Sequence, residues 1–148
     1  MQNEISELRT KRFIKERFKR RNTKKLSINN MQMVYVVSRL KGDINENTKC
    51  AKKYCRFVYE KNLMPIASHI MYPAMGFDDE NKEERDDCRL FGLYLLSLCD
   101  KVFCFIKNGE VSEGMVMEIQ TAKKLNIPIE YYDVLEDETY EYKGPRYN

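Results

Sequence analysis

Short apolar runs alternate with amphipathic stretches between residues 33 and 133. Four runs of mostly apolar residues predict buried strands: 33–37 (MVYVV), 64–68 (MPIAS), 101–106 (KVFCFI) and 127–133 (IPIEYYD). Helical patterns fill the intervals, over about 45–61, 84–98 and 112–126. The alternation of strand and helix predicts an α/β fold. We expect a Rossmann-like three-layer domain with a four- to five-stranded, mainly parallel sheet.

The remaining segments predict three parts along the chain. Residues 1–30 form a basic arm with a charged helix ending near Asn22, residues 31–135 form the domain, and residues 136–148 form an acidic, tyrosine-rich tail. Inside the domain, residues 69–84 are expected to form a long loop. Loops of that length in compact domains are often functional.

The loops that follow the predicted strands are the expected place for a ligand. Parallel sheets bind ligands beyond the carboxyl ends of their strands. In this chain those positions are the loops after Val37, Ala67 and Ile106. Most of the polar residues that could carry chemistry lie in or near these loops.

The net charge of +3 is unevenly distributed. The first 30 residues carry a formal charge of +7, and the other 118 carry −4. The basic character therefore belongs to the arm, where residues 1–25 could contact nucleic acid or a protein partner. A solvated helix or one packed in a homo-oligomer is the alternative.

Hydropathy and cysteine usage exclude several classes of protein. The longest uncharged apolar run, residues 90–99, is too short to span a membrane, and the charged N-terminus lacks a secretory signal. The five cysteines contain no C-x-x-C pair and the chain has one histidine, so no metal site is expected. We expect a cytoplasmic protein with reduced cysteines and no cofactor.

Two glutamates in the segment 111–122 (VSEGMVMEIQTA) are not equivalent on the predicted helix. At 100° per residue, Glu118 falls inside the buried arc that contains Met115 and Ala122, whereas Glu113 falls on the opposite side. Gly114 lies one turn before Glu118. Because helix side chains lean toward the N-terminus, the Glu118 side chain leans toward the open space that this glycine leaves. A carboxylate there needs a hydrogen-bond donor, a raised pKa or a ligand. A glutamate satisfied by a neighbouring lysine or tyrosine is the alternative.

Three segments, MVYVVSRLKGD, CDKVFCFI and SEGMVMEIQTAKKLNIPI, occur in this order and resemble the nucleoside 2-deoxyribosyltransferase-like superfamily. The superfamily includes deoxyribosyltransferases, a deoxynucleoside-monophosphate N-glycosidase, and uncharacterised small domains often encoded by phages or mobile elements. The resemblance is greatest to one of the uncharacterised groups. It covers about residues 33–133 and leaves the arm and the tail outside.

The resemblance implies a glutamate nucleophile within a pattern like S-x-G-x-x-x-E. Ser112, Gly114 and Glu118 match this pattern, so Glu118 would attack the anomeric carbon of a deoxyribose. In the family a tyrosine on the first strand orients the glutamate, and Tyr35 matches it. An aspartate that opens the third strand assists departure of the base, and Asp100 matches it.

The resemblance also implies a substrate-binding loop after the first strand, where some members recognise phosphate. This loop supplies Ser38, Arg39, Lys41, Gly42 and Asp43. Lys41 and Gly42 match the family pattern, while Ser38 and Arg39 replace its usual small residues. Beyond the resemblance, His69 follows the second strand and could contact a ligand or hold a structural hydrogen bond.

Three functions are consistent with these observations. The first is cleavage or transfer of the N-glycosidic bond of a nucleoside or nucleotide. The second is non-catalytic binding or sensing of a nucleotide derivative, with Glu118 holding ribose hydroxyls. The third is an interaction protein that uses its basic arm, with the domain as a scaffold.

Overall fold

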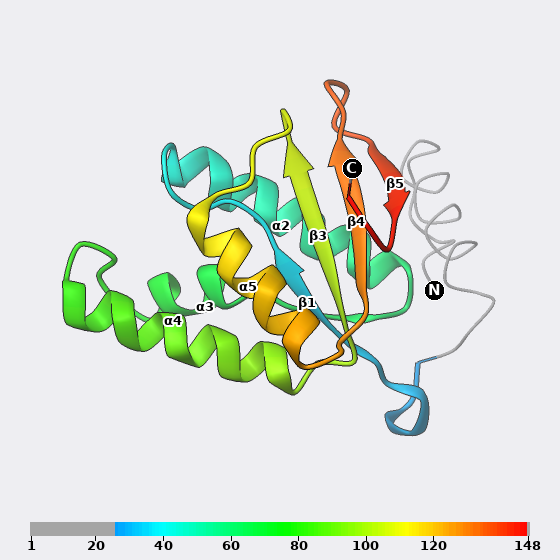
Figure 1. Cartoon of the computed structure of the whole chain (residues 1–148), viewed down its shortest axis with the longest axis horizontal. Coiled ribbons are helices and arrows are strands. Elements are labelled where there is room, and N and C mark those ends of the chain that lie inside the picture. The colour runs from blue at the N-terminus through cyan, green and yellow to red at the C-terminus, as the bar shows by residue number, and fades with distance from the viewer. Residues whose placement is uncertain (1–25, 148) are drawn as a thin grey trace, which may run out of the picture.

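The computed structural model describes residues 26–147, and in it five strands form one sheet with helices on both faces (Figure 1). The strands are β1 (Met33–Val37), β2 (Met64–Ile66), β3 (Lys101–Lys107), β4 (Ile129–Val134) and β5 (Tyr140–Gly144). The helices are α2 (Ile44–Glu60), α3 (Ser68–Ala74), α4 (Lys82–Ser97) and α5 (Glu113–Lys124), and a 3-10 turn, η2 (Ile28–Asn30), precedes β1. The charged helix expected before Asn22 lies outside the described residues.

The strand order in the sheet is β2-β1-β3-β4-β5. Strands β1 to β4 run parallel, and β5 runs antiparallel to β4. The predicted α/β class with a mainly parallel sheet is therefore confirmed. The chain leaves β1 toward β2 on one side and leaves β3 toward β4 on the other, so the loops after β1 and β3 diverge. Sheets of this kind bind ligands at such a point.

Both faces of the sheet are buried, which explains why its central strands read as continuous apolar runs. Successive side chains point to opposite faces. Tyr35 and Val37 pack with residues of α4 and α5, and Val34 and Val36 pack with residues of α2. Figure 1 shows α4 and α5 in front of the sheet and α2 behind it.

Two expectations about the irregular segments are corrected by the structure. Residues 69–84 are not one long loop, because most of α3 and the start of α4 lie within them. Residues 136–148 are not a separate tail, because Tyr140–Gly144 pairs with β4 and widens the sheet. The ordered domain therefore extends past residue 135.

Strand β5 is held by an aromatic cluster as well as by its hydrogen bonds. The ring of Tyr140 lies 4.7 Å from that of Phe57 and 5.5 Å from that of Phe105. Tyr54 stacks on Phe105 at 4.4 Å and meets Tyr140 edge-on. The C-terminal strand is thus anchored to α2 and to the centre of the sheet.

None of the helices within residues 26–147 has the length and apolar character needed to cross a lipid bilayer.

We expect Tyr140→Ala to lower the free energy of unfolding by about 1–3 kcal/mol, because it removes a half-buried ring from this cluster. Tyr142→Ala is the matched control, since that ring is 55% exposed and packs at the rim on Tyr132. The control should lose less than about 1 kcal/mol in urea denaturation. Equal losses in the two variants would contradict the anchoring role of Tyr140.

Candidate functional site

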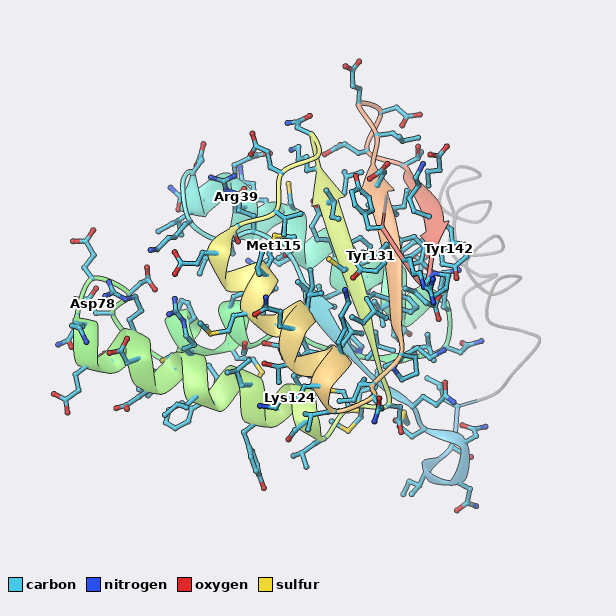
Figure 2. All side chains as sticks on the ribbon, in the orientation of Figure 1. Arg39, Asp78, Met115, Lys124, Tyr131 and Tyr142 are labelled. Atoms are coloured by element: carbon cyan, nitrogen blue, oxygen red, sulfur yellow. The ribbon has the colours of Figure 1, made fainter. Side chains whose placement is uncertain are left out.

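A cavity of about 210 Å³ lies at the carboxyl edge of the sheet, where the loops after β1 and β3 diverge. Segments that are distant in sequence surround it. The polar and aromatic residues of its wall are Ser38, Lys41, Ser68, His69, Tyr72, Phe77, Asp78, Asp79, Arg85, Arg89, Ser112, Glu113 and Glu118. Figure 2 shows Arg39 in the loop after β1, Met115 near the start of α5, and Asp78 in the loop that leads into α4.

Glu118 is the carboxylate that reaches furthest toward the sheet in this cavity. It is half-buried, and its Oε2 accepts a short hydrogen bond from the hydroxyl of Tyr35. Tyr35 is fully buried in the middle of β1, on the face covered by α4 and α5. The tyrosine hydroxyl also lies 2.7 Å from the hydroxyl of Ser68, the first residue of α3.

The environment of Glu118 raises its pKa into the range of neutral pH. Burial raises its pKa from 4.5 to about 7, while the hydrogen bond from Tyr35 and the positive charge of Arg89 limit the increase. Burial also raises the pKa of Tyr35 well above its ordinary value. The tyrosine hydroxyl therefore keeps its proton and remains a donor to the carboxylate.

The start of α5 is shaped so that Glu118 faces the cavity. Ser112 is the N-cap, and its hydroxyl accepts a hydrogen bond from the backbone N–H of Met115 at 3.3 Å. Met115 is buried against the sheet, whereas Glu113 is exposed in the first turn. A Cβ added at Gly114 would meet no atom within 4 Å, so this part of the wall is open.

A second polar pair lies at the end of β1. The Ser38 hydroxyl and Nε2 of His69 are 2.9 Å apart. Burial lowers the pKa of His69 to about 4, so its ring is neutral at physiological pH. A neutral ring can donate or accept one hydrogen bond toward a ligand but cannot supply a positive charge. Among the predicted binding-loop residues, Lys41 supplies that charge at this wall.

Asp100 lies at the opposite end of the sheet from the cavity, which corrects its expected place. Its Oδ2 accepts a hydrogen bond of 2.7 Å from the backbone N–H of Met33, and its own N–H donates to the carbonyl of Met33. Met33 opens β1, whereas the cavity lies beyond the end of that strand. Asp100 thus joins the starts of β1 and β3, and it does not reach a base bound beside Glu118.

Three other predicted binding residues are also outside this cavity. Arg39 forms an ion pair of 2.6 Å with Glu110, and Asp43 caps α2 by accepting from the N–H of Glu46. These two residues and Gly42 line a separate hollow on the α2 side. The predicted loop is therefore divided, with Ser38 and Lys41 in the cavity and the other three residues behind it.

Several cavity residues were not anticipated from the sequence. Ser68 completes the contact with Tyr35, Arg85 and Arg89 bring positive charge from α4, and Tyr72 and Phe77 add aromatic surface. The sequence indicated the loop after the second strand as a place for a ligand, but it did not single out these side chains. Within residues 26–147, no three His, Cys, Asp or Glu side chains gather in a way that could hold a metal ion.

Gly92 is a glycine in the middle of α4 that is explained by close packing. A Cβ at this position would lie 2.8 Å from the Ser68 hydroxyl and 3.1 Å from the Tyr35 hydroxyl. The first of these contacts is an overlap and the second is unusually tight, so a side chain here would force its neighbours to move. The absence of a side chain lets α4 approach the Tyr35–Ser68 pair.

The comparisons with known proteins agree with this architecture. A family model named DUF7768, a domain of unknown function, matches residues 32–132. A 2-deoxyribosyltransferase from the psychrotolerant bacterium Bacillus psychrosaccharolyticus shares the fold at 14% identity and a TM-score of 0.56, over 70% of this chain and 74% of that chain. A 2-deoxyribosyltransferase from Leishmania mexicana matches at 11% identity and 0.50, over 79% of this chain and 83% of that chain. A comparison with curated proteins finds no match.

We expect Gly92→Ala to lower the free energy of unfolding by about 1–3 kcal/mol through overpacking, although alanine favours a helix. Gly114→Ala is the matched change in a helix with open space, and it should be neutral or stabilising by up to about 1 kcal/mol. Thermal and urea unfolding of both variants test this difference. A gain of stability in Gly92→Ala would refute the close-packing explanation.

The raised pKa of Glu118 also makes stability depend on pH. Between 4.5 and about 7 the folded chain keeps a proton that the unfolded chain has lost, so rising pH lowers the free energy of unfolding through this window. We expect Glu118→Gln to be more stable than the wild type at pH 8, by on the order of 2 kcal/mol, and no more stable at pH 4.5.

Urea denaturation at the two pH values measures this effect. Glu136→Gln is the control, because Glu136 is exposed on the turn between β4 and β5. The control should show a small difference from wild type that is the same at both pH values. A Glu118→Gln difference that does not grow with pH would contradict a raised pKa.

Proposed function

The chain belongs to the DUF7768 family of domains of unknown function, and we propose that it cleaves or transfers the N-glycosidic bond of a nucleoside or nucleotide. The single observation that carries the proposal is Glu118, an ionisable carboxylate oriented by Tyr35 inside a cavity at the carboxyl edge of the sheet. The fold shared with two 2-deoxyribosyltransferases supports deoxyribosyl transfer as the class of reaction.

The proposed reaction proceeds through two displacements at the anomeric carbon. The Glu118 carboxylate forms a bond to C1′ as the bond from C1′ to the base nitrogen breaks, and the electron pair leaves with the base. The departing base takes up a proton from solvent, and the proton lost in the second step returns to solvent. In the second step, another base or water attacks C1′, loses a proton, and releases the carboxylate from the glycosyl ester.

The other residues of the cavity have roles consistent with this chemistry. Tyr35 holds one carboxylate oxygen by hydrogen bonding and leaves the other free to attack. Tyr72 and Phe77, whose rings meet edge-on at 5.8 Å, offer aromatic surface for a base. Lys41, Arg85 and Arg89 supply positive charge for a phosphate or for the developing charge of the base.

Non-catalytic binding of a nucleotide derivative is the second candidate. It is favoured by one observation, the position of Asp100, because the aspartate expected to assist base departure lies at the far end of the sheet. In this function Glu118 would accept or donate hydrogen bonds to ribose hydroxyls. The basic arm, which carries the third candidate function, lies outside the described residues.

We expect the wild-type protein to release free base from at least one member of a panel of deoxynucleosides and deoxynucleoside monophosphates. Glu118→Gln should reduce release at least about 10³-fold, because an amide is a poor nucleophile. Release is followed by chromatography, and a glycosyl adduct is sought by intact-mass analysis. Glu136→Gln is the control that should retain wild-type release, because Glu136 is exposed and is not part of the cavity wall.

The pH dependence gives an independent check on the nucleophile. Because the carboxylate must be ionised, kcat/KM should rise as pH increases through the pKa of about 7 of the free protein and level off above it. Tight nucleotide binding in calorimetry with no base released over long incubation would favour the sensor. Release that is unchanged in Glu118→Gln would remove Glu118 as the nucleophile.

A further inference from the structure

The buried hydroxyl of Ser68 is unexplained by the proposed reaction steps. Ser68 is 8% exposed and opens α3, and its hydroxyl lies 2.7 Å from the hydroxyl of Tyr35. It therefore contacts the group that contacts Glu118. A serine in this position either satisfies a buried hydroxyl or controls where the hydrogen of that hydroxyl points.

Counting hydrogens distinguishes these two roles. A tyrosine hydroxyl carries one hydrogen, and an ionised carboxylate can only accept. When Glu118 is ionised, the hydroxyl hydrogen of Tyr35 must therefore point to the Glu118 carboxylate. The hydrogen between the two hydroxyls must then come from Ser68. The three groups form a directed chain in which Ser68 donates to Tyr35 and Tyr35 donates to Glu118.

We propose that Ser68 is a positioning residue, which directs the Tyr35 hydroxyl hydrogen onto Glu118 and strengthens that hydrogen bond. Each donation polarises the next hydroxyl, so a chain of this kind holds the ionised carboxylate better than Tyr35 alone. The proposal rests on the proposed function for its catalytic meaning, since an ionised Glu118 is the nucleophile. The chain of hydrogen bonds from Ser68 through Tyr35 to Glu118 exists in the protein without substrate.

The packing of α4 supports this reading of Ser68. A Cβ at Gly92 would overlap the Ser68 hydroxyl at 2.8 Å and approach the Tyr35 hydroxyl at 3.1 Å. Glycine in a helix interior costs about 1 kcal/mol relative to alanine. Gly92 packs against the hydroxyls of Ser68 and Tyr35, and because it has no side chain, both hydroxyls can stay in their positions.

Other charged and titratable groups also face Glu118, and the test must separate them from Ser68. Arg89 and Arg85 come from α4, Cys104 comes from β3, and Lys41, His69 and Glu113 share the cavity wall. Changing Ser68 leaves all of these groups in place. A double-mutant cycle with Tyr35 then isolates the part of the effect that passes through the tyrosine hydroxyl.

The experiment is a carbon-13 NMR titration of the Glu118 carboxyl in the full-length protein, assigned by the signal that Glu118→Gln lacks. Tyr35→Phe should raise the pKa of Glu118 by about one to two units, since a hydrogen bond to the ionised form is lost. Ser68→Ala should raise it by a few tenths of a unit. In the Tyr35→Phe background, Ser68→Ala should cause no further change.

Matched variants guard against a merely structural effect. Ser97→Ala, an exposed serine on α4, should leave the Glu118 pKa at the wild-type value. Ser68→Cys keeps the shape of the side chain with a somewhat larger atom and a weaker donor, and it should also raise the pKa. It is the second variant to use if Ser68→Ala fails to fold. An unchanged pKa in the Ser68 variants would overturn the proposal, as would an equal shift with and without Tyr35.

The outcome is separable from that of the proposed function, because the titration needs no substrate. If base release is found, the acid limb of the kcat/KM profile should move to higher pH in Ser68→Ala, in step with the Glu118 pKa. If no substrate is turned over, the glycosidic function fails while the titration still decides the role of Ser68. A loss of kcat/KM in Ser68→Ala without movement of this acid limb would count against positioning.

Discussion

Burying one carboxylate beside a sheet is the constraint on which the site depends. The carboxylate of Glu118 cannot lie between α5 and the sheet unless a hydrogen-bond donor reaches it, because an isolated ionised group away from water is strongly disfavoured. Tyr35 supplies the donor from the strand below, and Arg89 supplies positive charge from α4. The remaining cost appears as a pKa of about 7, so the site is held at the boundary between its charged and neutral forms.

The elements with a clear period were predictable from sequence, and those defined by tertiary contact were not. The run 33–37 matches β1, and the helical pattern over about 45–61 matches α2. The helix α3 has seven residues and contains Pro73, so its sequence is too short to show a helical period of apolar residues. Strand β5 is half polar because it lies at an edge, so its sequence, YEYKG, reads as a tail.

The site shows the same division. Helix geometry was enough to separate Glu118 from Glu113, because both lie on one helix whose buried side can be projected. Asp100 was misplaced because its position at the start of a strand sets it at the amino edge, opposite the ligand-binding edge. Ser68 and Gly92 meet only through the packing of α3 against α4, and no local spacing records that contact.

The strand β2 has a consequence for how this domain meets other molecules. It is an edge strand of three residues, and its central residue, Pro65, has no N–H that could bond to an incoming strand. Edges of this kind resist extension of the sheet by a neighbouring chain. Self-association that continues the β-structure is therefore disfavoured on that side, and assembly there would have to use the surfaces of helices.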